Sequence, residues 1–395
     1  MCRPATGCGS PPCWTIWPGW RTPPCWTRAA RRVLAAGWAG RVRRRLLWSR
    51  CCRGCWRVRS WRRHGSSWRA STRTRRNWRP ARRRWPVVEV APWWSLFVAP
   101  ALLLILAVLA LAGDALLAAT VAGRPATASA ALRPLLEVPR LLVAQPRRTP
   151  APDVLLWRLG VLVVPVAAVL SVLVVPFGHR VVADLEVGVV WFNVMEVLTW
   201  GGLWLAGWGP NAAFSLIGGY RFIAQGLAYE LPLMFALISA GTGAESLRLS
   251  DIVAAQQGLW FAVWMPVAFV VYLASVLAFS FLGPFGYPAD RDIAGGVLGE
   301  TSGVDRLMLQ AGRWLLLAAG AAMAVPLFLG GGAGPGLPAW AWSLIKTLAV
   351  LGLLVWVRRR MPTVRADRYV EFAWVVLIPL TIAQALVPAL VVLNR

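Results

Sequence analysis

The chain has 395 residues, of which 58% are hydrophobic and only 15% are charged. A soluble domain carries about 25% charged residues, so this composition excludes an ordinary soluble enzyme and indicates a membrane protein. The net charge of +26 is unevenly spread, because residues 1–86 contain 23 arginines and no acidic residue, whereas the rest of the chain is close to neutral.

Residues 1–86 form an Arg-, Trp- and Cys-rich segment that differs in chemistry from residues 87–395. The segment holds all 7 cysteines of the chain, and its hydrophobic residues follow neither the period of a strand nor that of a helix. It lacks the continuous apolar stretch of a secretory signal. We interpret it as disordered or as the result of a start codon assigned too early, and we favour the second.

Two functions compete with that interpretation: a nucleic-acid-binding arm and a polybasic membrane anchor. Cys51, Cys52 and Cys55 contain one C-x-x-C pair, but a zinc or iron–sulfur site needs about four ligands. The other cysteines are irregularly spaced and His64 is isolated. We therefore expect neither a bound metal nor a nucleic-acid partner.

Hydrophobic stretches of membrane-spanning length dominate residues 87–395. A bilayer core needs about 20 apolar residues per helix, and eight stretches meet that length. A buried soluble core is the alternative, but it would need polar covering helices that the sequence lacks. The sequence therefore predicts an all-α, polytopic membrane domain with eight transmembrane helices. The predicted spans are 93–112, 154–176, 187–208, 217–241, 259–282, 307–330, 338–357 and 369–392.

Arginines in the connecting loops predict the orientation of the spans. Because loops rich in Lys and Arg stay in the cytoplasm, we assign the loops after spans 1, 3, 5 and 7 to that side. Both ends of the domain then lie outside. Arginine-rich segments are disfavoured on that side, so this orientation supports the start-codon interpretation of residues 1–86. The loop arginines behind this assignment are Arg124, Arg133, Arg140, Arg147, Arg148, Arg291, Arg306, Arg358, Arg359, Arg360, Arg365 and Arg368.

The loop after the first span contains a segment, 131–145, with the pattern of an interfacial helix. Its leucines recur at helical spacing, and Glu137 and Arg140 occupy polar positions between them. Such a helix lies on the membrane surface with its apolar face in the lipid. Since proline has no amide proton to donate, we expect the helix to be interrupted at Pro139.

The fourth span carries ionisable residues within an apolar sequence. Arg221, Gln225 and Tyr229 recur every four residues and share a helix face, and Glu230 follows Tyr229 directly. A charge at mid-span costs about 2.5–3.5 kcal/mol on insertion scales, so such groups face a bundle interior or a wet cavity. We favour a proton relay. The alternatives are a structural ion pair between helices and an Arg221 side chain that reaches the membrane surface.

Two other spans also contain ionisable residues at depth. Glu196 lies near the middle of the third span and Lys346 lies within the seventh. Alternating acids and bases can pass protons, because each neighbour changes the proton affinity of the next. Asp114, just after the first span, is interpreted as interfacial. The sequence contains no nucleophile–base, P-loop or dinucleotide motif, so we expect no self-contained catalytic site.

Segments in chain order across about residues 120–390 resemble one known family. The most specific is GGYRFIAQGLAYELPL, which contains Arg221, Gln225, Tyr229 and Glu230, followed by WVRRRMPTVRADRY. The other matching segments are LRPLLEVPRLL, LVVPFG, VVADLEVGVVWF, GWGPNAAFSLI, SLRLSDIVAAQ, GPFGYPADRDIAGGVLGETSG and FAWVVLIPL. Together they resemble the H subunit of NADH-quinone oxidoreductase, the eight-helix subunit 1 of respiratory complex I.

The resemblance implies a membrane subunit that anchors the peripheral electron-transfer arm and helps to form the chamber where quinone is reduced. Glu230 would be the main acid of the proton path, with Arg221, Gln225 and Tyr229 lining it and Lys346 continuing it. No cofactor would bind to this chain, because the redox groups belong to other subunits, and quinone would be the substrate of the complex. The implied partners are the other complex I subunits and the lipid bilayer of a bacterial-type inner (plasma) membrane.

The remaining site residues implied by the resemblance lie in the loops assigned to the cytoplasm. Glu137 and Arg140 match the acid and base of the interfacial helix near the quinone entry. The quinone-chamber candidates after span 5 are Asp290, Asp292 and Glu300. The residues expected in the docking loop after span 7 are Arg358, Arg365 and Asp367.

The loop after span 5 departs from the family pattern. The family has an acid where Phe279 stands, Asn-Arg where Phe281 and Leu282 stand, and an aspartate where Gly286 stands. These positions shape the quinone chamber, so a second hypothesis is a homologous membrane anchor without quinone reduction, as in hydrogenase-type complexes. A secondary transporter is a third class, but it would need inverted repeats, and we find no convincing repeat.

Overall fold

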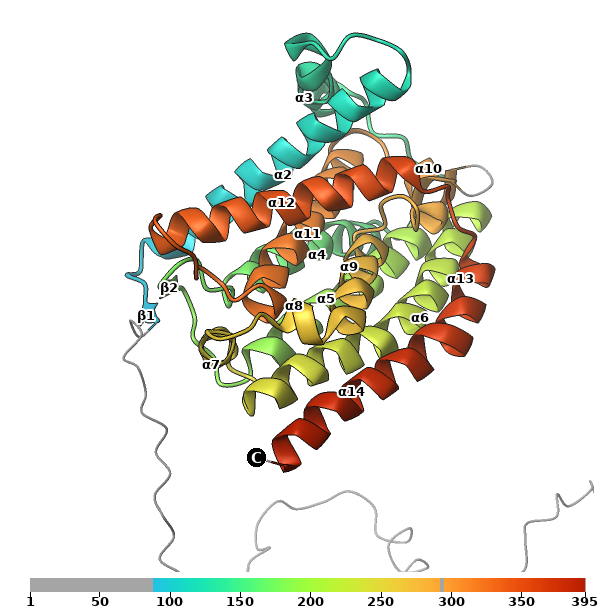
Figure 1. The fold of residues 1–395 in the computed structure, drawn as a ribbon. Coiled ribbons are helices and arrows are strands. Elements are labelled where there is room, and N and C mark those ends of the chain that lie inside the picture. The colour runs from blue at the N-terminus through green and yellow to red at the C-terminus, as the bar shows by residue number, and fades with distance from the viewer. Residues whose placement is uncertain (1–87, 292–294, 395) are drawn as a thin grey trace, which may run out of the picture. The chain divides into compact units, whose positions relative to one another are not determined.

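The structure is a computed structural model that describes residues 88–291 and 295–394. Residues 1–86 and Asp292 lie outside the described residues, so the predictions made for them remain predictions. Every long element of the described body is an α-helix, accompanied by a two-stranded parallel sheet of β1 (Glu89–Val90) and β2 (Arg180–Val181) (Figure 1). The predicted all-α fold is confirmed.

Seven helices within the described residues are long and apolar enough to cross a membrane, and they match seven of the eight predicted spans. They are α2 (Ser95–Val121), α4 (Val154–Val172), α5 (Gly188–Trp208), α6 (Ala213–Ala244), α11 (Gly303–Phe328), α12 (Ala339–Arg360) and a C-terminal run, Ala366–Leu393. This run consists of α13 (Ala366–Phe372), a π-helical turn η3 (Ala373–Leu377) and α14 (Ile378–Leu393).

The remaining predicted span, 259–282, is not one continuous helix. A short helix, α8 (Phe261–Trp264), ends at Met265, and α9 (Pro266–Phe279) begins with its proline. Pro266 has no amide proton to continue the hydrogen bonds of the preceding turn, which explains the break. The 14 residues of α9 rise only about 21 Å, less than the ~30 Å thickness of a bilayer core.

The loops after spans 1, 3, 5 and 7 meet at one end of the bundle, which we call the α3 end. It carries α3 (Ala128–Val143), the π-helical turn η1 (Tyr287–Arg291) and α10 (Gly296–Gly299) (Figure 1). The hydrogen bonds that join these loops run from Arg147 N to Ser302 Oγ, from Thr149 Oγ1 to Pro210 O and from Val364 N to Pro284 O. The loops therefore share one end, as the arginine distribution predicts, and its assignment to the cytoplasm stays a prediction.

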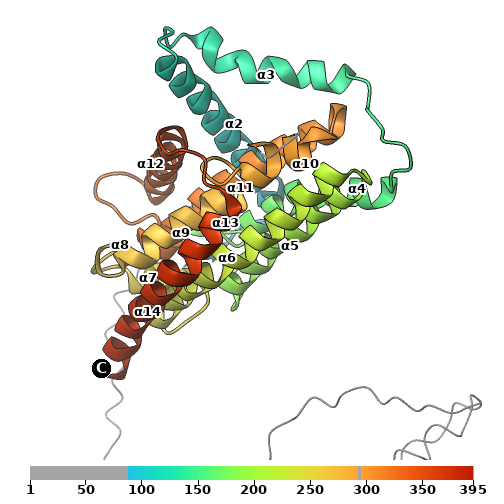
Figure 2. The same ribbon diagram turned by 90° about the vertical axis from the view of Figure 1, so that its right-hand side faces the viewer.

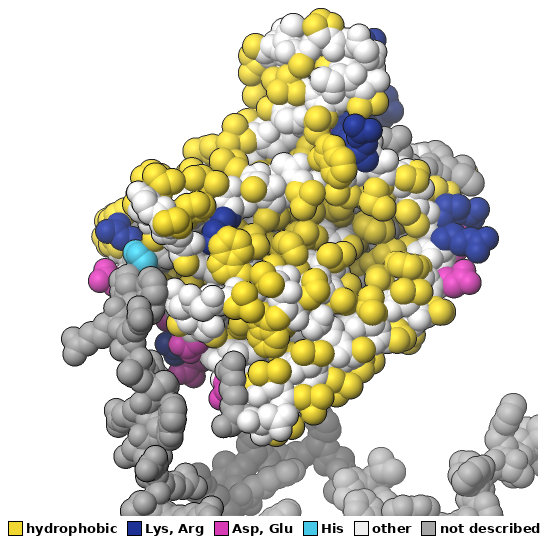
Figure 3. Space-filling view, in the orientation of Figure 1, with side chains coloured by type: hydrophobic (Ala, Val, Ile, Leu, Met, Phe, Trp, Pro, Cys, Tyr) yellow, Lys and Arg dark blue, Asp and Glu magenta, His cyan; other side chains and the backbone are white. Residues whose placement is uncertain are grey.

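The opposite end, called the β1 end, carries the small sheet and α7 (Leu249–Ala255). There Arg248 pairs with Asp184 at 3.3 Å and with Glu186 at 3.2 Å. Hydrophobic side chains cover most of the molecular face between the two ends, and charged side chains gather toward its edges (Figure 3). This distribution is the one expected of a body whose middle zone faces lipid.

The helix α11 lies at the centre of the bundle. In its most apolar stretch 94% of the residues are buried, compared with 22% in α2 and 17% in the C-terminal run. It packs against α2, α4, α9 and α12 (Figure 2). The outer spans therefore leave most of their apolar side chains exposed, whereas α11 forms the core.

Glycine allows α4 and α5 to approach each other closely. A Cβ atom added to Gly160 of α4 would lie 2.4 Å from the amide nitrogen of Ala206 and 2.6 Å from the carbonyl oxygen of Gly202, both on α5. Small residues at helix interfaces allow such backbone contact in membranes. This contact fixes the position of α5, which carries Glu196.

The predicted interfacial helix is α3, which lies crosswise over the α3 end of the long helices (Figure 2). Thr127 caps its start, because Thr127 Oγ1 accepts a hydrogen bond from Ala130 N at 3.4 Å. The expected interruption at Pro139 is wrong, since the helix runs through both Pro134 and Pro139. The two prolines leave two backbone carbonyls of α3 without an amide partner. No residue of α3 is buried, so these carbonyls remain accessible to water.

Candidate functional site

A buried polar cluster lies where α5 and α6 pack together. Glu196 of α5 is 2% exposed, and Tyr229 and Glu230 of α6 are 0% and 8% exposed. Glu230 Oε1 accepts a hydrogen bond from Asn193 Nδ2 at 2.6 Å. The carboxyl group of Glu196 interacts electrostatically with Glu230 and with the Tyr229 hydroxyl. We call these four residues the α5–α6 cluster.

Most polar atoms of the α5–α6 cluster lack a hydrogen bond of good geometry. Among the described residues, no partner bonds to either carboxylate oxygen of Glu196, to Glu230 Oε2, to the Tyr229 hydroxyl or to Asn193 Oδ1. Buried polar atoms are normally hydrogen-bonded, and leaving one unpaired costs about 1–3 kcal/mol. The structure thus places two carboxyl groups and a phenol together inside the bundle.

A polar line continues along α6 from the cluster toward the α3 end. Gln225 is fully buried, and its Nε2 donates to the carbonyl of Ala278 in α9 at 3.1 Å. One turn further, the guanidinium of Arg221 lies 6.0 Å from the centre of the Tyr287 ring in η1. Arg221 and Glu230 are nine residues apart, about 14 Å along the helix. Hence α6 connects the cluster with the loop that follows α9.

Aromatic residues of α9 close the cluster on one side. The ring centre of Phe279 lies 6.5 Å from that of Tyr229, and Phe279 also lines a small gap beside Glu196. Tyr272, two turns earlier on the same face of α9, donates its hydroxyl to the carbonyl of Gly320 at 2.9 Å. Phe279 is the position where the family resemblance implies an acid, so an apolar ring stands beside the cluster at that point.

The described members of the expected quinone-chamber set lie at the α3 end, on two segments of the chain. Asp290 of η1 forms an ion pair with Arg313 of α11 at 3.0 Å. Glu137 and Arg140 are exposed on α3, and Glu300, just after α10, is half-buried. Two segments therefore carry these residues, α3 and the chain between α9 and α11. They approach each other where a Cβ on Gly303 would lie 2.9 Å from the carbonyl oxygen of Ala144.

A buried ion-pair group at the α3 end was missed by the sequence reasoning. Asp114 is 5% exposed, pairs with Arg358, and accepts a hydrogen bond from Arg359 Nε at 2.6 Å. The guanidinium of Arg358 lies 5.0 Å from the centre of the Trp314 ring. Asp114 does not follow the first helix as expected, because α2 continues to Val121; whether it lies at the membrane interface stays a prediction. The sequence did contain one indication of this pairing: the predicted orientation places the end of the first span, with Asp114, on the same side as the loop with Arg358 and Arg359.

Lys346 makes its contacts at the β1 end and not in the α5–α6 cluster. Its Nζ donates to the carbonyls of Leu329, Gly331 and Ala333 at 2.7, 2.9 and 2.8 Å, and lies 4.5 Å from the centre of the Trp260 ring. An ammonium group has three protons to donate, so each has an acceptor. The arrangement fastens the loop after α11 to α12.

Of the expected docking residues, Arg358 is used in the pair with Asp114. Arg365 and Asp367 instead pair with each other at 3.1 Å, with side chains 67% and 68% exposed. Asn193 was not predicted for the cluster, although it lies three residues before Glu196 and therefore shares its helix face.

Comparison with known proteins then identifies the family. A sequence model described as NADH dehydrogenase matches residues 94–389, which cover α2 to α14 and the whole α5–α6 cluster. The chain belongs to this family. One similar protein is the H subunit numbered 1 of the NADH-quinone oxidoreductase of Geobacter metallireducens. It is 34% identical over 275 residues, which are 67% of this chain and 84% of that protein.

Two further relatives are also H subunits of NADH-quinone oxidoreductases. The one numbered 2 from Geobacter sulfurreducens is 35% identical over 267 residues, covering 65% of this chain and 81% of that protein. The one from Syntrophotalea carbinolica is 34% identical over 269 residues, covering 65% and 82%. The chain is thus a multi-pass membrane member of the NADH dehydrogenase family, homologous to a subunit of an enzyme complex.

Proposed function

We propose that the chain is the membrane subunit of a complex I-like NADH-quinone oxidoreductase in the inner (plasma) membrane of a bacterium. In this proposal the α5–α6 cluster is part of the proton-translocation path, and the α3 end helps to form the quinone chamber with the peripheral arm. The chain holds no redox cofactor, and electrons reach its substrate, quinone, from other subunits. The family match and the names of the relatives support the assignment to this enzyme complex.

The observation that carries the proton role is the state of the α5–α6 cluster. Two carboxyl groups and a phenol are enclosed by helices, stand within electrostatic reach of one another and keep unpaired oxygens. Glu196 and Glu230 stand close enough to interact electrostatically, so a proton taken up by one can be passed to the other. Asn193 orients Glu230 through its hydrogen bond, which leaves Glu230 Oε2 for the incoming proton.

The segment η1 gives a route by which quinone chemistry could act on the cluster. It holds Tyr287, which lies beside Arg221 of α6, and Asp290, which pairs with Arg313 of α11. A change of charge at the α3 end would alter both contacts, since each involves a cation. The polar line of α6 then leads from Arg221 to Glu230.

Proton pumping by the reconstituted complex tests this function. The complex carrying Glu230→Gln is placed in proteoliposomes, and NADH-driven quinone reduction and internal acidification are recorded together. Acidification should be lost, because glutamine cannot release a proton. The matched control is Glu245→Gln, the same substitution at the exposed end of α6, which should pump normally. Normal pumping by Glu230→Gln would remove this residue from the mechanism.

A second function, a membrane anchor of a hydrogenase-type complex without quinone reduction, is favoured by the packing after α9. Phe279 places an apolar ring against Tyr229. A Cβ atom on Gly286 would lie 3.2 Å from Phe281 O and 3.3 Å from Asp290 Oδ1, so the acid implied by the resemblance has little room there. Inhibition of the purified complex by quinone-site inhibitors would argue against this anchor, and insensitivity would support it.

A further inference from the structure

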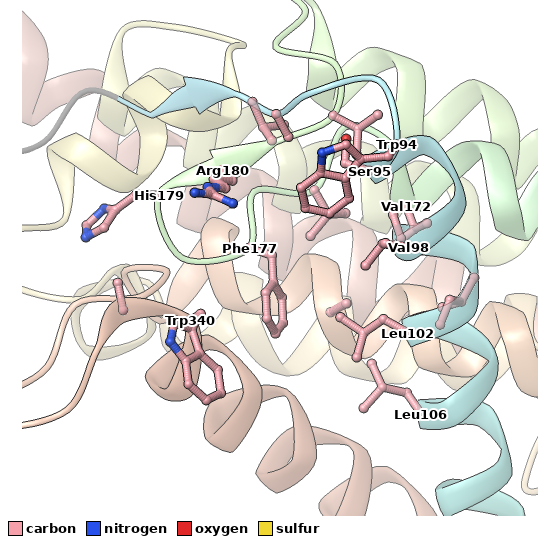
Figure 4. A pocket seen from close by; sticks show the side chains of 18 of the residues that line it. Trp94, Ser95, Val98, Leu102, Leu106, Val172, Phe177, His179, Arg180 and Trp340 are labelled. Atoms are coloured by element: carbon pink, nitrogen blue, oxygen red, sulfur yellow. The ribbon is translucent and has the colours of Figure 1, made fainter.

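An apolar cavity of about 620 Å³ lies at the β1 end, away from the charged groups of the α3 end (Figure 4). Val98, Leu102 and Leu106 of α2 form one wall, with Phe177 and Trp340 across from them. Small-molecule sites typically measure about 300–1,000 Å³ and are mostly apolar. The size and lining therefore fit a hydrophobic ligand, and none of the residues of the α5–α6 cluster belongs to the cavity.

The cavity begins at the start of α2 and extends along this helix. Two tryptophans flank it at the β1 end: Trp94 directly precedes α2 and Trp340 lies in the first turn of α12, with exposures of 46% and 57%. Tryptophan is enriched at the level of lipid headgroups. From Ser95 to Leu106 the lining follows α2 for eleven residues, about 16 Å along the helix. This direction is that of a lipid chain.

Two exposed basic side chains, His179 and Arg180, also line the cavity. Arg180 has no ion pair within the described part of the chain. The turn that carries it is fixed, since Phe177 and Arg180 exchange backbone hydrogen bonds of 2.8 and 3.2 Å. The amide of Gly178 donates to Ser343 Oγ at 3.0 Å. The backbone that carries Arg180 is thus fixed beside the apolar cavity.

We propose that this cavity binds one acyl chain of an anionic phospholipid, with the lipid phosphate against Arg180 and His179. The apolar walls match the chain, the tryptophans mark the headgroup level, and the basic side chains complement the phosphate. A quinone tail would fit the walls but would leave Arg180 without an anion. A zwitterionic lipid would place a second, positive group beside the same cations.

The site can be tested with photoactivatable lipids that carry a diazirine in the acyl chain. Membranes containing the full chain receive either phosphatidylglycerol or phosphatidylcholine of the same chain length, and cross-linked peptides are located by mass spectrometry. We expect cross-links in the starts of α2 and α12, about tenfold more frequent with phosphatidylglycerol. A factor of ten corresponds to about 1.4 kcal/mol, near the lower end for a hydrogen bond to a charged group.

Two pairs of variants complete the test. Arg180→Gln should remove the preference for phosphatidylglycerol, whereas Arg158→Gln, an exposed arginine of α4 outside the cavity, should keep it. Ala99→Trp fills the cavity and should abolish the cross-links, whereas Leu104→Trp on the outer face of α2, where Leu104 is 54% exposed, should not.

The proposal would be overturned by equal labelling with both lipids, by labelling that Ala99→Trp leaves unchanged, or by displacement of the probe with a quinone but not with unlabelled phosphatidylglycerol. If Ala99→Trp fails to accumulate in the membrane, two results still test the proposal: displacement of the probe from the unaltered chain by unlabelled lipid or quinone, and the lipid preference of Arg180→Gln. Absence of cross-links in α2 and α12 of the unaltered chain would also refute the site.

Discussion

Removing the charge of Asp114 should destabilise the bundle more than removing any exposed acid. The Asp114 side chain is 7% exposed, and its partners Arg358 and Arg359 are 14% and 31% exposed. Breaking a buried ion pair by removing one partner costs about 3–5 kcal/mol, because the other charge stays buried. Arg359 is exposed enough to regain water, so the penalty comes mainly from Arg358. We therefore expect Asp114→Asn to cost about 3 kcal/mol, the lower end of that range.

The assay is reversible unfolding of the full chain in mixed micelles, with a double-mutant cycle. Arg358→Met alone leaves Asp114 paired with Arg359, and the double variant removes the unpaired buried cation. The loss of unfolding free energy in the double variant should therefore be smaller than the sum of the losses in the two single variants. Asp367→Asn is the matched control, since the exposed pair of Asp367 contributes about 0–1 kcal/mol. Additive effects, or equal effects of Asp114→Asn and Asp367→Asn, would refute this account of the ion pair.

Three other substitutions test the packing. Gly160→Ala should prevent stable assembly because the added Cβ would meet the α5 backbone at 2.4 Å, whereas Gly201→Ala, with nothing within 4 Å, should not; size-exclusion profiles compare the two. Lys346→Met should expose the loop after α11 to limited proteolysis, since three carbonyls lose their donor; unchanged cleavage would contradict that role. Gln256→Leu removes hydrogen bonds to both α7 and the end of α11 and should lower the Tm by several degrees more than Gln257→Leu.

Hydropathy alone predicted most of the membrane body because each outer span is apolar around its whole circumference. It placed the end of α2 too early, since Asp114 is polar by itself and becomes compatible with burial only when Arg358 and Arg359 pair with it. It also joined α8 and α9 into one span, although Pro266 was a visible sign of a break. A hydropathy average measures how apolar a stretch is, but it does not register that a proline lacks the amide proton needed to continue a helix.

The candidate site was predicted in its residue types but not in its pairings. Glu196 and Glu230 were both selected as buried acids, and the structure brings them together across the α5–α6 contact. Helices that are apolar all round give no amphipathic signal for the face they turn inward, so the sequence could not show which residues meet. For the same reason Lys346 was placed with the acids, whereas its contacts are with loop carbonyls at the β1 end.

In the proposed function, Glu196 and Glu230 exchange protons while the complex turns over. The most direct measurement is infrared difference spectroscopy of the complex during quinone reduction, observed at the C=O stretch of protonated carboxyl groups. We expect a carboxyl band that changes on turnover and disappears from the difference spectrum in both Glu196→Gln and Glu230→Gln, but not in Glu245→Gln. A band that persists unchanged in both cluster variants would contradict it.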